Sequence, residues 1–140
     1  MSRESLEKEL QQKYLQLQLY KHQFNAYVEE KNKVDDRVSE LRMTIGALEK
    51  LGGVSKGDEI WSSLGSSAFV MSGIKDTENV LINVGAGVVV KNTRERSLEI
   101  LQSRLGELSE VNKSLAAEIL KYGEEIGRLE PDVRRLAQKL

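Results

Sequence analysis

Few residues in this chain have the types and spacing that binding or catalytic chemistry requires. Gly85-Ala86-Gly87 follows a hydrophobic run, as at the start of a dinucleotide-binding fold, but that fingerprint needs a third glycine three residues later and then a helix. Position 90 is Val90, in the β-branched run Val88-Val89-Val90, which favours a strand. The glycines therefore predict a turn between two strands, and we expect no nucleotide cofactor.

Other chemical groups are equally sparse. His22 is the only histidine and falls at an outer helical position, where a solvated residue is expected rather than a catalytic base or metal ligand. Asp76-Thr77-Glu78-Asn79 is too short for a calcium loop and predicts a turn. Sequence neighbours on a helix do not face each other, so adjacent carboxylates indicate solvated surfaces. These pairs are Glu29-Glu30, Asp35-Asp36 and Glu124-Glu125. We expect neither an enzyme nor a metal site.

The composition argues against a single compact core, because only 39% of the 140 residues are hydrophobic and 5% are aromatic. With 21 basic and 22 acidic residues, the net charge of -1 predicts no broad attraction to nucleic acid or to membranes. No apolar run approaches the ~20 residues that span a bilayer, and the charged first residues do not resemble a signal peptide. The chain has no cysteine for disulfides, and we expect a soluble cytoplasmic protein.

Two stretches have the period of a coiled coil, with positions taken in alternating steps of four and three. In residues 1–51 these are Leu6, Leu10, Lys13, Leu17, Tyr20, Phe24, Tyr27, Lys31, Val34, Val38, Leu41, Ile45 and Leu48. In residues 93–140 they are Leu98, Leu101, Leu105, Leu108, Asn112, Leu115, Ile119, Tyr122, Ile126, Leu129, Val133, Leu136 and Leu140. Eleven of the first thirteen and twelve of the second thirteen are apolar. This period predicts two helices that each bury a narrow seam.

The two seams have equal numbers of positions, and folding the chain back pairs Leu48 with Leu98 and Leu6 with Leu140. In every pair the two residue numbers add up to 146. Equal lengths favour an antiparallel hairpin within one chain, whereas the alternative, parallel dimers between chains, does not require them. A polar residue such as Asn112 at a seam position can fix the register.

Several residues predict where the helices end. Gly52-Gly53 follows the first helix where a left-handed residue is expected, and Asn92 with Glu95 resembles a capping box at the start of the second. Pro131 removes a helical hydrogen bond and crowds the carbonyl of Gly127, at a cost of ~3 kcal/mol. We therefore expect the end of the second helix to be bent or frayed.

Residues 52–92 contain four strand candidates separated by turns, which predicts two β-hairpins: Glu59–Leu64 with Ala68–Ile74, and Val80–Val84 with Val88–Lys91. An isolated hairpin is marginally stable, so we expect other chains to cover these strands in a shared sheet or barrel, on which Trp61 would pack. The residues assigned to this assembly are Ile60, Phe69, Val70, Ile74, Val80, Ile82, Val84, Val88 and Val90.

The order helix, two hairpins, helix resembles the alpha-type subunit of the prefoldin family. The hairpin motifs that carry this resemblance are Ser67-Ala68-Phe69-Val70, Gly73-Ile74-Lys75-Asp76-Thr77 and Val80-Leu81-Ile82-Asn83-Val84-Gly85-Ala86-Gly87. The resemblance implies an α+β fold, in which a long antiparallel coiled-coil hairpin carries two β-hairpins that assemble into an intersubunit β-barrel. It also implies a hexamer of two alpha-type and four beta-type subunits that holds unfolded proteins without ATP and passes them to a group II chaperonin.

The sequence departs from the family pattern at a few hairpin positions. The first strand, Ile60–Leu64, lacks the proline common there, and Val88 and Lys91 stand where an aromatic and an acidic residue are frequent. These departures bear on partner choice, and a homo-oligomeric or filament-forming relative remains an alternative, as does a structural scaffold that binds no client.

A chaperone of this kind needs apolar groups outside the seam. We assign client binding to an off-seam cluster near the start of the first helix, and to further residues on the second helix that lie off the seam or would be exposed by fraying beyond Pro131. These residues are Tyr14, Leu15, Leu19, Leu120, Leu136 and Leu140.

Overall fold

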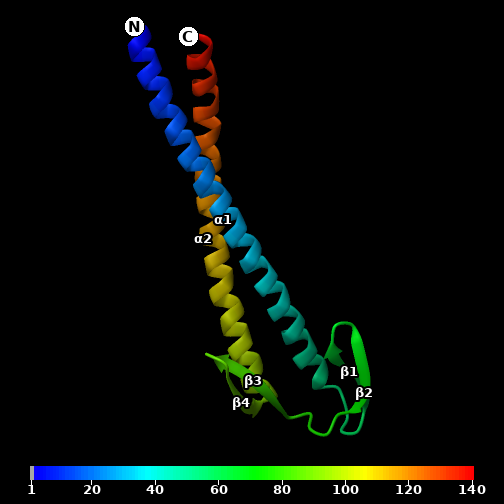
Figure 1. Cartoon of the computed structure of the whole chain (residues 1–140). Coiled ribbons are helices and arrows are strands. Elements are labelled where there is room, and N and C mark those ends of the chain that lie inside the picture. Colours follow the sequence, from blue (N-terminus) through cyan, green and yellow to red (C-terminus); the bar gives the residue numbers. More distant parts are fainter. Residues whose placement is uncertain (1) are drawn as a thin grey trace. The chain divides into compact units, whose positions relative to one another are not determined.

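The computed structural model describes residues 2–140, which form two long helices with two β-hairpins between them (Figure 1). In chain order the elements are α1 (Arg3–Leu51), β1 (Glu59–Gly65), β2 (Ala68–Gly73), β3 (Asn79–Gly85), β4 (Val88–Thr93) and α2 (Arg94–Gln138). This order confirms the predicted α+β class. The chain divides into two compact units: unit 1 combines the described residues up to Arg37 with Leu108–Leu140, and unit 2 is Val38–Glu107.

Unit 1 is an antiparallel pair of helix segments, with the start of α1 and the end of α2 at the same end of the unit (Figure 1). Its seam positions are buried or half-buried except Leu140, as the 3.5-residue period predicts. The Tyr122 ring packs on Tyr20 and Tyr27, with ring centroids 5.5 and 5.7 Å apart. Phe24, the predicted partner of Tyr122, lies beside Gly123.

The end of α2 differs from the expectation of a frayed helix. Pro131 lies inside the helix, which continues to Gln138. The turns beyond Pro131 are held by packing, because Leu136 is only 8% exposed, and by the ion pair between Asp132 and Lys13 of α1. These contacts offset the lost backbone hydrogen bond, so the prediction of fraying is wrong, while the bend expected as its alternative stays a prediction.

Unit 2 is built around a small core of Ile45 from α1, Ile82 from β3 and Leu101 from α2. Partly buried apolar residues surround these three, including Leu48 and Leu98, which sequence analysis paired across the seam. The second hairpin therefore packs one face on the helix ends of its own chain.

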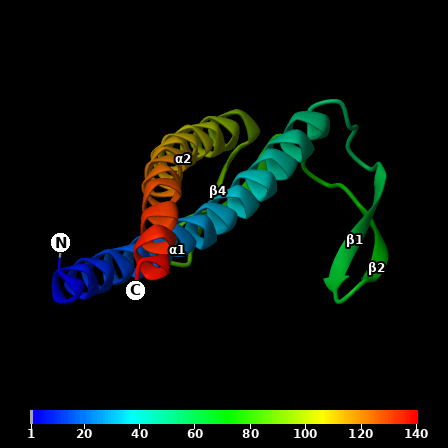
Figure 2. The ribbon, with the colours of Figure 1, turned by 90° about the horizontal axis from the view of Figure 1, so that it is seen from above.

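The two hairpins have the same construction. In each, two antiparallel strands pair residue by residue and shift register near the turn, between Ser63 and Gly65 in the first and between Asn83 and Gly85 in the second. Figure 2 shows β1 and β2 as a twisted two-stranded ribbon. Gly85 and Gly87 have φ angles of 123° and 75°, a left-handed region that glycine adopts readily. The Gly85-Ala86-Gly87 motif is therefore a hairpin turn, as predicted.

The first helix ends at Leu51 as predicted, but the predicted cap of the second helix and the predicted conformation of Gly52 need correction. The N-cap of α2 is Thr93, whose Oγ1 accepts a hydrogen bond of 3.1 Å from the backbone N–H of Arg96, while Asn92 lies in β4. At the end of α1, Gly52 is not among the residues with a positive φ in the described chain. Its lack of a side chain instead leaves room for the Arg94 guanidinium, which would lie 2.9 Å from a Cβ atom there.

Candidate functional site

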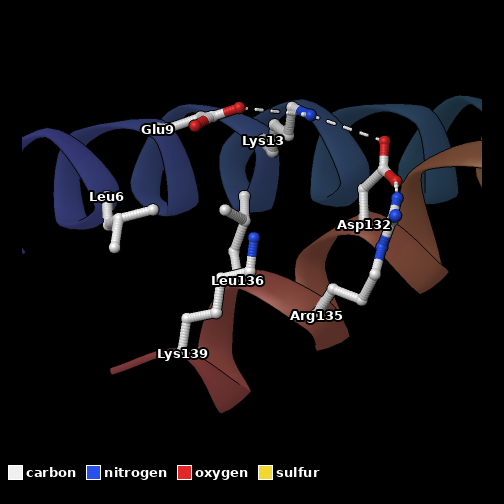
Figure 3. A pocket seen from close by; sticks show the side chains of 7 residues that line it. All are labelled: Leu6, Glu9, Lys13, Asp132, Arg135, Leu136 and Lys139. Atoms are coloured by element: carbon white, nitrogen blue, oxygen red, sulfur yellow. Dashed lines mark hydrogen bonds and ion pairs between the residues drawn. The ribbon is translucent and has the colours of Figure 1, made fainter. Parts of the chain in front are cut away.

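The predicted client-binding residues belong to unit 1, and most of them lie on its surface. We call the end of unit 1 that holds the start of α1 and the end of α2 the open end (Figure 1). Tyr14, Leu15 and Leu19 of α1 are 51%, 61% and 56% exposed, although the seam beside them is closed. Leu120 of α2 and Leu140, which follows the end of α2, are exposed as well. Leu136 is the exception, because it points from α2 toward α1 and is buried (Figure 3). Leu136 was assigned to client binding because the end of α2 was expected to fray. Since the helix continues to Gln138 and buries Leu136, this side chain is not accessible to a client in this conformation.

A charged cleft of about 350 Å³ lies next to Leu136 (Figure 3). The Lys13 Nζ atom is 3.5 Å from a carboxylate oxygen of Glu9 and 3.4 Å from one of Asp132, and Asp132 also accepts a hydrogen bond from Arg135. The Arg135 guanidinium, together with Lys13, holds the pKa of the Asp132 carboxyl below its usual value. Since Asp132 of α2 pairs both with Arg135 and with Lys13 of α1, these ion pairs tie the two helices together.

A polar layer interrupts the seam of unit 1. The Asn112 side-chain amide donates a hydrogen bond of 2.8 Å to Asp35, which also accepts one of 3.1 Å from Lys31. The Asn112 bond, followed by that from Lys31, lowers the pKa of Asp35. Because Asp35 is next to Val34, the predicted partner of Asn112, this contact agrees with the predicted register.

The first hairpin, β1 with β2, exposes apolar side chains on both of its faces. Trp61 and Phe69 share one face and are 67% and 59% exposed. Ile60 and Val70, which alternate with them along the strands, project from the opposite face and are exposed too. Nothing among residues 2–140 covers either face, so this hairpin exposes apolar side chains on both sides.

The second hairpin differs, because one of its faces is covered by the chain itself. Ile82, which we assigned to assembly, is 7% exposed and lies in the core of unit 2. Val90 packs on the same core, while Val84 and Val88, near the turn, are exposed. The expectation that all cover must come from other chains is therefore wrong for this face, because alternate side chains of β3 and β4 point toward the helices.

Within 2–140, no three His, Asp or Glu side chains are placed to hold a metal ion. The Asp76 carboxylate instead accepts hydrogen bonds from the backbone N–H groups of Glu78 and Asn79, and these lower its pKa. This confirms the predicted turn. Neither helix in the described part of the chain has an apolar stretch sufficient to cross a membrane.

Comparison with known families identifies the fold. A protein-family model described as "Prefoldin subunit" matches residues 20–139. The chain belongs to the prefoldin family. The prefoldin subunit alpha of Methanococcus vannielii is 25% identical over 132 residues, which cover 94% of this chain and 88% of the relative. The prefoldin subunit alpha of Archaeoglobus fulgidus is 23% identical over 135 residues, which cover 96% of this chain and 98% of the relative.

Two solved structures of prefoldins share the fold. A filamentous prefoldin from Methanocaldococcus jannaschii, studied by electron cryomicroscopy, superposes with a TM-score of 0.71 at 20% identity, covering 82% of this chain and 95% of that one. The prefoldin beta subunit of Thermococcus strain KS-1 superposes with a TM-score of 0.59 at 17% identity. The superposition covers 91% of this chain and 90% of that subunit. The match to the family model and the alpha-subunit relatives identify this prefoldin chaperone subunit as alpha-type.

Sequence analysis missed the residue that fixes the second hairpin to α2 of this prefoldin. The Arg104 guanidinium donates a hydrogen bond of 2.6 Å to the backbone carbonyl of Asn83, near the end of β3. One signal for this packing is present in the sequence. The last predicted strand ends at Lys91 and the predicted helix cap, Asn92, follows it directly, so the strand was expected to run into the helix without a loop, as β4 runs into α2.

Proposed function

We propose that this prefoldin subunit is part of an ATP-independent holdase, which captures unfolded proteins at the open end of unit 1 and delivers them to a group II chaperonin. The observation that supports capture is the exposure of Tyr14, Leu15 and Leu19 beside a closed seam. Burying apolar surface of a client on these side chains is favourable by roughly 25 cal/mol per Å². Several arms acting together raise the effective concentration, which gives retention with easy release.

The same proposal includes assembly with beta-type subunits, two alpha and four beta, through a shared β-barrel. The two uncovered faces of the first hairpin support it, because contiguous exposed apolar surface of this kind marks an interaction site. Neither β1 nor β2 contains a lysine or proline, the residues that commonly protect strand edges from pairing with other chains.

A triple variant tests client capture. Replacing Tyr14, Leu15 and Leu19 with serine should reduce suppression of client aggregation, followed by light scattering, while native mass spectrometry shows unchanged assembly. Met43→Ser is the matched control, because Met43 is an exposed apolar residue of α1 in unit 2, and it should leave suppression unchanged. Full suppression by the triple variant would refute this surface, whereas failure of the unmodified chain to suppress aggregation would favour a scaffold without client binding.

The alternative assembly is a homo-oligomer or filament, suggested by the likeness to a filamentous prefoldin. The two assemblies differ in mass. Native mass spectrometry of the chain alone and with a beta-type subunit should give a discrete hexamer only in the mixture. A ladder of masses from the chain alone would favour the filament.

A further inference from the structure

The segment of α1 that carries the exposed leucines has an unusual composition. Five of the chain's seven glutamines lie between residues 11 and 23, and no acidic residue occurs from Leu10 to Val28, the longest such stretch in a chain with 22 acidic residues. The next stretch is the opposite, since eight of the twelve residues from Glu29 to Glu40 are charged. Solubility alone does not explain this change, because charged residues serve that purpose along the rest of the helix.

The glutamines and leucines share the outer side of α1 in unit 1. At 100° per residue, Gln11, Gln12, Leu15, Gln18 and Leu19 all fall within one outward sector, away from the seam. All five are exposed. We call these five residues the glutamine face. The match to the family model begins at residue 20, so the face lies outside the matched range.

The cations near this face are already paired. Lys13 contacts Glu9 and Asp132, and Lys21 lies 3.2 Å from Glu130 of α2. The glutamine face therefore offers primary amides and apolar side chains, with no unpaired charge of its own.

Amides of this kind match the chemistry of an unfolded backbone. A glutamine side chain both donates and accepts hydrogen bonds, and each residue of an extended segment has one N–H and one C=O that lack a partner in the chain. In a client segment that is already helical, most of these N–H and C=O groups are hydrogen-bonded within the helix. A charged client segment would lose hydration at this surface without gaining an opposite charge.

We propose that the glutamine face selects extended, uncharged segments of unfolded polypeptide, with the leucines contacting apolar side chains and the amides contacting the peptide backbone. This inference rests on the proposed holdase function and specifies its substrate class. The complementarity is of hydrogen bonding and charge together: neutral amides on the protein face neutral peptide groups on the client.

The first test compares three unstructured peptides with the same apolar residues, which carry no charge, three aspartates or three lysines. The full chain should bind the uncharged peptide at least about threefold more tightly than either charged one, measured by fluorescence anisotropy. Equal affinities for all three would overturn the proposal.

The second test replaces Gln11, Gln12 and Gln18 together. Methionine keeps the size, exposure and helix propensity but removes the amides, so Gln→Met should weaken binding of the uncharged peptide about threefold to tenfold. A purely apolar surface predicts equal or tighter binding, and that result would overturn the proposal. Gln→Glu should reverse the selectivity and favour the lysine peptide.

Controls separate this inference from the holdase function itself. Gln102→Glu changes an exposed glutamine of α2 in unit 2 and should leave all three affinities unchanged. The serine variant replaces Tyr14, Leu15 and Leu19 with serine. If it no longer binds the peptides while the Gln→Met variant binds them normally, the capture surface is supported and the role of the amides is refuted. If the serine variant also binds normally, the proposed capture surface itself is wrong. Circular dichroism verifies that each variant remains helical.

Discussion

The two β-hairpins of this prefoldin have matching topology, register shifts and glycine turns, but their surroundings differ. Ile82 of the second hairpin is 7% exposed and packs between α1 and α2, whereas Trp61 and Phe69 of the first hairpin are mostly exposed. Local sequence is therefore sufficient to form either hairpin, but only the second is supported within its own chain. Our proposal is that another subunit provides the same support to the first hairpin.

Chain connectivity explains this difference. β4 ends at Thr93 and α2 begins at Arg94, so the second hairpin must lie along the helix that it enters. Seven residues, 52–58, separate α1 from β1, and this connection does not force the first hairpin onto a helix. The longer link leaves the first hairpin free to present both faces to partners.

The largest expected difference between the hairpins is in stability. Ile82→Ala should lower the free energy of unfolding of the lone chain by about 2–5 kcal/mol, because it leaves a cavity in the core of unit 2. Phe69→Ala removes a larger side chain but should cost less than about 0.5 kcal/mol, since Phe69 is exposed. Urea unfolding followed by circular dichroism measures both values. Similar losses would mean that the first hairpin also belongs to the core.

Hydrogen exchange should show the same contrast in the unmodified chain. Amides paired between β1 and β2 should exchange at least about tenfold faster than those paired between β3 and β4, which corresponds to ~1.4 kcal/mol less local stability. The comparison uses equivalent pairs, such as Ser62 with Val70 and Ile82 with Val90. Equal protection in the lone chain would contradict the difference in support.

The junction between β4 and α2 offers a smaller and more local test. Thr93→Ala should destabilise unit 2 by ~1 kcal/mol, because the backbone N–H of Arg96 loses its capping oxygen. Thr93→Ser keeps that oxygen and should retain most of the stability in the same thermal denaturation. If Asn92→Ala proved the more damaging change, the cap would be at the position that sequence analysis predicted.

The smallest effect is expected at the turn between the hairpins. The backbone N–H groups of Glu78 and Asn79 lower the pKa of Asp76 below its ordinary value of 3.8. The Asp76 carboxylate therefore stabilises the start of β3 fully above pH 3.8. This stabilisation is lost as the pH falls through the lower pKa that Asp76 has in the folded state. Protection of the Asn79 amide should decline in that range, and Asp76→Asn should remove this pH dependence. A decline that persists in the variant would assign the effect to another group.

Periodicity predicted the helices, the four strands and the exposure of Tyr14, Leu15 and Leu19, because these features depend on local spacing. It did not separate Ile82 from Phe69, since both are apolar strand residues and only connectivity decides which one meets a helix. Asn92 and Thr93 are neighbours with similar capping preferences, so the helix start was misplaced by one residue.

The end of α2 shows a different limit of prediction from sequence. The cost of Pro131 is local and can be estimated from the residue type, but the gain from burying Leu136 depends on contacts with α1. That gain is roughly 2 kcal/mol for a leucine side chain. Tertiary packing of this size is comparable with the proline penalty, which explains why the helix continues.

Trp61 provides the most direct measurement of whether other subunits cover the first hairpin, because it is the only tryptophan in the chain and lies on that surface. Beta-type subunits are added while native mass spectrometry verifies that a complex forms. The Trp61 emission should then shift to shorter wavelength and become resistant to acrylamide quenching. An assembled complex in which Trp61 stays as accessible as in the lone chain would contradict the proposal that partners complete this hairpin.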